Sequence, residues 1–131
     1  LEIAILVRYI TSVKPDKKTG NLDRSGYLLL HQISLRGPAG VKALANEFHL
    51  DISTVSRQAA VLEAKGFVYK VPDPMDGRAY TYQITDLGKK ELDKYKKERI
   101  AKLEKLLEGW TDEECRIFGE LLRKFNHSFS T

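Results

Sequence analysis

Hydroxyl and guanidinium side chains are concentrated in one short stretch near the middle of the chain, STVSR at 53–57. Hydroxyl groups donate and accept hydrogen bonds, and an arginine can bind a guanine edge or a phosphate through two N–H groups. A second arginine, Arg78, follows in the turn DPMDGR. A helix with small polar groups, followed by a turn that carries an arginine, has the residue types that read double-stranded DNA.

The first group of side chains requires a helix, which the sequence predicts at 52–65 with Asp51 as its N-cap. At helical spacing, one stripe of apolar residues is expected to be buried: Ile52, Val55, Ala59 and Leu62. The opposite face carries Ser53, Arg57 and Ala60, with Thr54 and Ser56 on its flanks. Such a face could enter a major groove, where Arg57 can contact guanine or phosphate. An ordinary surface helix with a serine-rich start is the alternative that this helix alone leaves open.

The second group requires a β-hairpin. Two stretches have the two-residue period of strands, with Phe67, Tyr69 and Val71 in the first and Tyr80, Tyr82 and Ile84 in the second. Pro74 and Gly77 favour a turn between them, and Asp76 is placed to hold Arg78 or to accept hydrogen bonds from turn amides. An arginine at such a tip suits a minor groove. An exposed ion pair of little energetic worth is the alternative.

The remaining pattern predicts helices before and after this region. We expect helices at 1–13, 23–35 and 41–48. Thr85 is expected to cap a long helix that runs to about residue 108 and carries Tyr95 on its apolar face, and the last helix begins with a capping box of Thr111 and Glu114. The fold class predicted is therefore mostly α with a small antiparallel β-hairpin. The expected order is four helices, the hairpin and two further helices.

Composition is that of a globular domain with a modest excess of positive charge. The chain has 131 residues, 42% of them hydrophobic, and a formal net charge of +4. The charges of segment 51–85 nevertheless cancel: Arg57, Lys65, Lys70 and Arg78 against Asp51, Glu63, Asp73 and Asp76. A non-specific phosphate binder would be more basic there. If this segment reads DNA, we expect a few placed contacts, duplicated in a dimer.

The sequence gives no indication of a membrane protein. No apolar run approaches the roughly 18 residues that span a bilayer, and the apolar start is interrupted by Glu2 and Arg8. A single cysteine, Cys115, excludes an internal disulfide and suits the cytoplasm. Because the sequence begins at Leu1 and not at methionine, we expect the native first helix to extend further.

Four motifs, STVSR, LEAKGFV, DPMDGRA and ITDLG, resemble the winged helix–turn–helix of MarR-type transcriptional regulators. The resemblance is clear over residues 23–92. It extends through GPAGVKALANEF, where family members usually carry a hydroxyl or acidic residue near Gly40. The resemblance assigns the recognition-helix roles to Ser53, Thr54, Ser56 and Arg57, and the wing roles to Asp76 and Arg78. We include Gln58 among the candidate DNA-contacting residues.

The resemblance also implies an intertwined homodimer. It divides the chain into an N-terminal dimerisation helix and linker at 1–22, a DNA-binding domain at 23–92 and C-terminal dimerisation helices at 93–131. Apolar residues at both ends need a partner surface: Leu6, Val7, Ile10, Phe118, Leu121, Leu122 and Phe125. Packing on the chain's own long helix is the alternative. A symmetric dimer would read a palindromic operator, most simply as a repressor.

MarR-type regulators often release DNA when a small, frequently phenolic ligand binds. Tyr9, Tyr27 and His31 are the candidate pocket residues, although core packing explains their spacing equally well. Redox sensors of this family use a cysteine near the first helix, which this chain lacks, so we expect Cys115 to serve packing.

No cofactor or metal site is predicted, because His31, His49 and His127 have no metal-ligand spacing. The sequence also has no enzyme signature. A winged helix that binds another protein without binding DNA remains the competing function, which the neutral charge of 51–85 keeps open.

Overall fold

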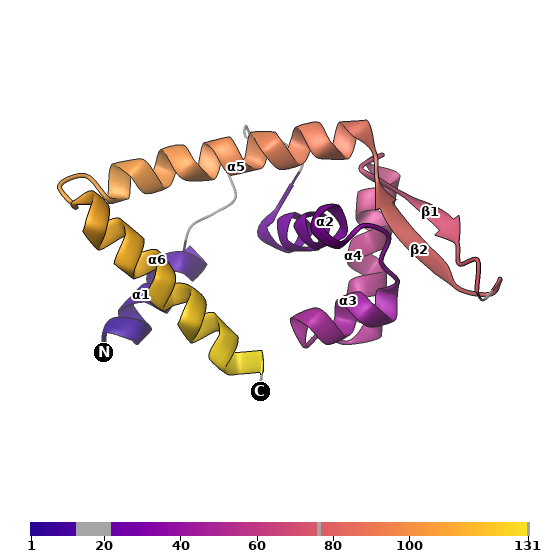
Figure 1. The fold of residues 1–131 in the computed structure, drawn as a ribbon, viewed down its shortest axis with the longest axis horizontal. Helices are drawn as coiled ribbons and strands as arrows, with labels where there is room; N and C mark the ends of the chain where they lie inside the picture. The colour runs from indigo at the N-terminus through magenta and orange to yellow at the C-terminus, as the bar shows by residue number, and fades with distance from the viewer. Residues whose placement is uncertain (13–21, 76, 131) are drawn as a thin grey trace. The chain divides into compact units, whose positions relative to one another are not determined.

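The computed structural model describes residues 1–12, 22–75 and 77–130. Its elements follow the predicted order of four helices, a hairpin and two helices (Figure 1): α1 (Glu2–Ser12), α2 (Arg24–Arg36), α3 (Val41–Phe48), α4 (Ile52–Ala64), β1 (Val68–Pro72), β2 (Tyr80–Ile84), α5 (Asp86–Leu106), α6 (Asp112–His127) and the short 3₁₀ helix η1 (Ser128–Ser130). The predicted fold class is confirmed. The chain forms two compact units, Leu1–Lys96 and Lys97–Thr131, which are described separately here.

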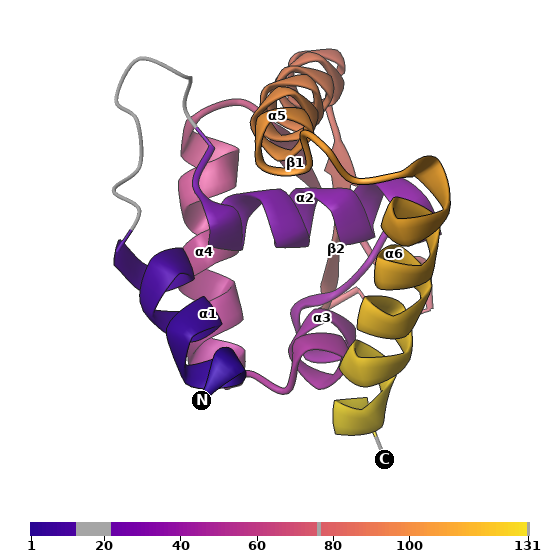
Figure 2. The ribbon, with the colours of Figure 1, turned by 90° about the vertical axis from the view of Figure 1, so that its left-hand side faces the viewer.

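The hydrophobic core lies in the first unit, where α2 packs across α4 and α3 packs beside it (Figure 2). Its buried residues come from α2, α3, α4, the start of the hairpin, β2 and α5: Leu29, Leu30, Ile33, Leu44, Ala45, Val55, Ala59, Leu62, Phe67, Val68, Tyr82 and Leu92. The start of α2 is capped by Asp23, whose Oδ1 accepts a hydrogen bond from the N–H of Gly26 at 2.7 Å. This core fixes α4 in one rotation about its axis.

The hairpin pairs β1 and β2 antiparallel, with Val68 opposite Ile84 and Pro72 opposite Tyr80. Ala39, in the connection from α2 to α3, adds a two-hydrogen-bond bridge to the other side of β2. Its N–H donates to the Tyr82 carbonyl at 3.2 Å, and the Tyr82 N–H donates back at 2.9 Å. A single bridging residue has no sequence period, so this contact was not predicted. It attaches the edge of β2 that faces away from β1 to the connection between α2 and α3.

A close contact joins the hairpin to α5. Thr85 caps α5 by accepting a hydrogen bond from the Gly88 N–H at 2.9 Å, and its hydroxyl donates to the Gly66 carbonyl at 2.6 Å. A Cβ on Gly88 would clash with the Phe67 carbonyl oxygen, so only glycine fits there. The predicted Thr85 cap is confirmed. The ITDLG motif therefore fixes the start of α5 against the base of the wing.

Three local predictions were wrong in detail. Ile52 is 51% exposed instead of buried, because it lies at the first position of α4, where no earlier helical turn covers it. Asp51 occupies the N-cap position with extended backbone, but its side chain makes no cap hydrogen bond. The hairpin does not alternate strictly, because Phe67 and Val68 are both buried at the point where the chain leaves α4.

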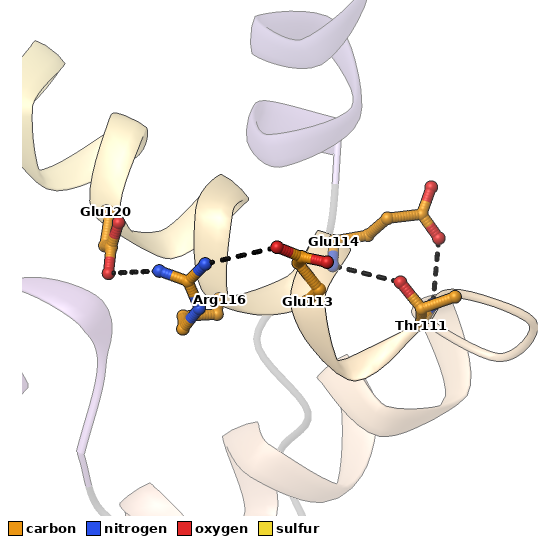
Figure 3. Close-up of polar contacts among 5 residues, drawn as sticks. All are labelled: Thr111, Glu113, Glu114, Arg116 and Glu120. Carbon is orange, nitrogen blue, oxygen red and sulfur yellow. Dashed lines mark hydrogen bonds and ion pairs between the residues drawn. The ribbon is translucent and has the colours of Figure 1, made fainter.

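In the second unit, α6 begins with the predicted capping box (Figure 3). The Thr111 hydroxyl accepts from the Glu114 N–H at 3.1 Å, and the Glu114 carboxylate accepts from the Thr111 N–H at 2.9 Å. Trp110 packs edge-on against Phe118 with ring centroids 5.5 Å apart. None of the described residues from Lys97 onward is buried. This unit is thus ordered by local contacts.

Candidate nucleic-acid interface

The exposed face of α4 is polar, as predicted. Val55, Ala59 and Leu62 are buried on one side of the helix, which turns the opposite side outward. Ser53, Ser56 and Arg57 on that side are exposed, whereas Thr54 and Gln58 are partly covered at its edges. Because Ala60 is also exposed and small, the N-terminal half of α4 has little bulk that would keep it from a groove floor.

A tight turn between α3 and α4 sets the direction of α4. His49 adopts a left-handed conformation with φ 53°, the only positive φ among the described residues other than glycines. The Leu50 N–H then donates to the Ala45 carbonyl at 3.0 Å and closes the end of α3. Leu44 and Ala45 on α3 are buried in the same core as Val55. The two helices therefore form a helix–turn–helix whose second helix, α4, presents an exposed polar face.

The tip of the wing is held by Asp73. Its backbone N–H donates to the Ala79 carbonyl at 3.0 Å, and its carboxylate accepts from the Met75 N–H at 2.9 Å. Arg78 is exposed in this turn. Asp76, the predicted partner of Arg78, lies outside the described residues. Asp73 thus caps a turn amide by the same Asx-turn chemistry that the sequence suggested for Asp76.

Lys70 connects the wing to the C-terminal part of α4. Its ammonium group lies 3.7 Å from a Glu63 carboxylate oxygen and 5.6 Å from the centre of the Tyr80 ring. Sequence reasoning counted the charges of Lys70 and Glu63 but did not pair them, because they belong to different elements. The pair accounts for part of the charge cancellation in 51–85. The paired charges lie toward the C-terminal end of α4, away from the N-terminal half that carries Arg57.

Two of the three candidate effector residues lie together. The ring centres of Tyr27 and His31 are 5.8 Å apart, and Tyr27 stacks on Tyr95 of α5 at 4.5 Å. Burial, followed by the nearby charge of Lys96, lowers the pKa of His31 and so favours its neutral ring. Tyr95 was predicted only as part of an apolar helix face. The aromatic cluster on α2 and α5 is therefore larger than the sequence suggested.

Tyr9, the third candidate, lies on α1 and is 67% exposed. It lines a hollow of about 450 Å³ formed with Ile5, Arg8 and Ser12. A second hollow of about 530 Å³ lies between the end of α2, the hairpin and the start of α5. Neither hollow is lined by Tyr27 or His31. Of the three candidates, the ring contacts of the described residues join Tyr27 and His31.

Other chemistry is not assembled in the parts that the structure describes. Within residues 1–12, 22–75 and 77–130, no three histidine, cysteine or acidic side chains come together as metal ligands. Cys115 lies partly buried in the first turn of α6. Of the helices described, none combines the length and the apolar character that a bilayer crossing requires.

Known proteins share this arrangement. The MarR family model matches residues 22–80. The HTH-type transcriptional regulator YxaD of Bacillus subtilis (strain 168) is 51% identical over 114 residues, which cover 87% of this chain and 80% of the relative. A second regulator of that strain, YybA, is 29% identical and covers 94% of this chain and 83% of the relative.

Solved structures agree with the sequence relatives. A MarR protein from Peptoclostridium difficile superposes with a TM-score of 0.80 at 25% identity, covering 98% of this chain and 85% of that one. The regulator BldR from Sulfolobus solfataricus gives 0.78 at 25% identity, with 98% and 91% covered. The resemblance to the MarR family is therefore confirmed. The chain belongs to the MarR family of transcriptional regulators, with the DNA-binding winged helix–turn–helix fold, and not to a class of enzymes.

Proposed function

We propose that this regulator is a homodimeric repressor that binds a palindromic operator in double-stranded DNA. In this proposal α4 enters the major groove, the β1–β2 hairpin reaches the adjacent minor groove, and the protein works in the cytoplasm with its DNA. The observation that carries it is the division of α4, whose Val55 and Leu62 are buried while Ser53 and Arg57 are exposed. A helix positioned by its apolar side and polar on its outer side is the reading element of this fold.

Each candidate residue has a contact that its chemistry favours. Arg57 is the residue for a bidentate contact to guanine, and Gln58 can pair with adenine if its partly covered amide turns outward. Ser53, Thr54 and Ser56 supply short hydroxyls for base edges or phosphates. In the wing, Arg78 enters the minor groove, with Asp76 as its positioning partner. These contacts are few, which agrees with the zero net charge of 51–85.

Dimerisation supplies the affinity that one such surface lacks. No residue of α1 or α6 is buried within the chain, although both helices carry large apolar side chains. The exposed ones are Ile3, Ile5, Leu6, Val7, Ile10, Ile117, Phe118, Leu121, Leu122 and Phe125. Apolar surface of this extent favours an interface. We propose that segments 1–22 and 93–131 pair two copies, and that 23–92 binds the DNA.

A small aromatic effector is the proposed release signal. Tyr27, Tyr95 and the neutral ring of His31 offer stacking surfaces where α2 meets α5. A ligand that binds there better in the DNA-free state would lower operator affinity by that difference. Tyr9 would contribute from α1. In an in vitro transcription assay with a promoter that overlaps the operator, the protein should lower the amount of transcript. An effective ligand should restore that amount.

Selection of bound sequences from a random duplex pool tests the proposal directly. We expect an inverted repeat whose half-site centres lie about 10 base pairs, one helical turn, apart. A single unrepeated motif would contradict the dimeric part of the proposal. If no duplex is enriched at any salt concentration, DNA reading by α4 is wrong and the protein-binding alternative replaces it.

A further inference from the structure

Ile52 is a large apolar side chain beside an exposed face of α4 that carries Ser53, Ser56 and Arg57. It is 51% exposed at the first position of α4, and Leu50 just before the helix is 43% exposed. Neither exposure follows from the sequence pattern, which placed Ile52 in the buried stripe. The core beneath it is already filled by Val55 and Ala59, both completely buried.

The position of Ile52 places it at the edge of the reading face. It adjoins Ser53 in the chain, and it lies one helical turn before Ser56 on the same side of α4. Helical side chains tilt toward the N-terminus, so the Ile52 side chain extends over the end of α4. That end is the one whose residues contact base edges when a helix–turn–helix docks.

We propose that Ile52 reads a thymine in each half-site by packing on its 5-methyl group. This inference rests on the proposed docking of α4 in the major groove. The thymine methyl is the apolar group that the major-groove edges of the base pairs present, and an exposed branched aliphatic side chain is its matching surface. Hydroxyls and Arg57 would specify the hydrogen-bonding bases, and Ile52 would specify a position that hydrogen bonds alone do not.

Deoxyuridine isolates this contact, because it differs from thymidine only by the missing methyl group. Each thymine of the selected operator is replaced in turn, symmetrically in both half-sites, and the Kd of the full-length protein is measured. At one position we expect binding to weaken by about fourfold per half-site, or roughly 15-fold for the pair. Ile52→Ala should weaken binding to the thymine operator similarly. The same deoxyuridine replacement should cost that variant almost nothing further.

Val61→Ala is the matched control, because Val61 is also 51% exposed on α4 but lies roughly 14 Å further along the helix. It should keep the full sensitivity to deoxyuridine, and Ile52→Val should keep part of it. The assignment of Ile52 would be overturned if deoxyuridine weakened binding of Ile52→Ala by the same factor as it weakens binding of the wild type. It would also be overturned if no thymine position were sensitive in the wild type. Both results would leave DNA reading intact. Failure of every duplex to bind would instead overturn the proposed function itself.

Discussion

The winged helix buries apolar side chains in a core, whereas the terminal helices leave theirs exposed. In the winged helix, Leu30 and Val55 are completely buried among neighbours from other elements. In α6, Leu121 is 58% and Phe125 47% exposed, and the described part of α1 buries nothing. The winged helix therefore has a core of its own, whereas the terminal helices carry an apolar surface that their own chain does not cover. We interpret the first as the reading unit and the second as the pairing unit.

Local contacts explain how α6 is helical without a core. Arg116 lies between Glu113 at 3.5 Å and Glu120 at 2.9 Å on the exposed side of the helix (Figure 3). The capping box at Thr111 fixes the first turn. Such contacts contribute only a few tenths of a kcal/mol to about 1 kcal/mol each. They define the helix, but they leave its apolar stripe available to a second copy.

The largest expected effect is on the free energy of unfolding, which one glycine-to-alanine substitution in each region should change in opposite directions. Gly88→Ala should lower the free energy of unfolding by about 3 kcal/mol, because the new Cβ meets the Phe67 carbonyl oxygen and Ile84. Gly119→Ala in α6 meets nothing within 4 Å and should raise helix stability by up to about 1 kcal/mol. Urea unfolding measures both. The same sign for both variants would remove the contrast between the regions.

A charge placed on the apolar stripe of α6 tests the pairing role. Leu121→Lys should weaken self-association on the order of 100-fold, because each copy would bring an ammonium group into an apolar interface. The winged helix should remain folded, since Leu121 contributes to no core. Analytical ultracentrifugation over a range of protein concentrations gives the self-association constant. Arg123→Ala, on the polar side of α6, is the control, and equal association of the two variants would contradict the assignment.

The two arginines of the reading unit should differ in kind. Arg57→Ala should cost about 1–3 kcal/mol on the selected operator and little on random DNA if it contacts a base edge. Arg78→Ala should weaken binding and reduce the slope of log K against log salt by about 1 for each protomer. Neither should alter the dimer. An equal loss on both DNAs for Arg57→Ala would mark a phosphate contact instead.

The smallest expected effect concerns His31. Its pKa in the folded protein lies below the ordinary value of 6.5, through burial and then Lys96. The unfolded chain therefore takes up the proton first as the pH falls. The stability linked to neutral His31 is complete above about pH 6.5 and is lost progressively below it. His31→Gln should reduce the slope of stability against pH on that acid side, and an unchanged slope would exclude a contribution from His31.

The sequence predicted those elements whose evidence is local. The helical stripe of Val55, Ala59 and Leu62 and the capping box at Thr111 depend on residues within one or two turns, and both are confirmed. The Ala39 bridge and the Lys70–Glu63 pair depend on distant segments meeting, which no period encodes. The predicted burial of Ile52 was wrong for a third reason, because helical periodicity does not show where a helix begins. The errors thus concentrate at boundaries and at contacts between elements.

The mass of the complex on the selected operator tests the central claim most directly. Native mass spectrometry of the full chain should give two copies in solution and two copies on one duplex with both half-sites. On a duplex that has one half-site, the wild type should bind far more weakly. The account would be contradicted if a single copy bound one half-site with the full operator affinity, because the terminal helices would then have no part in DNA reading.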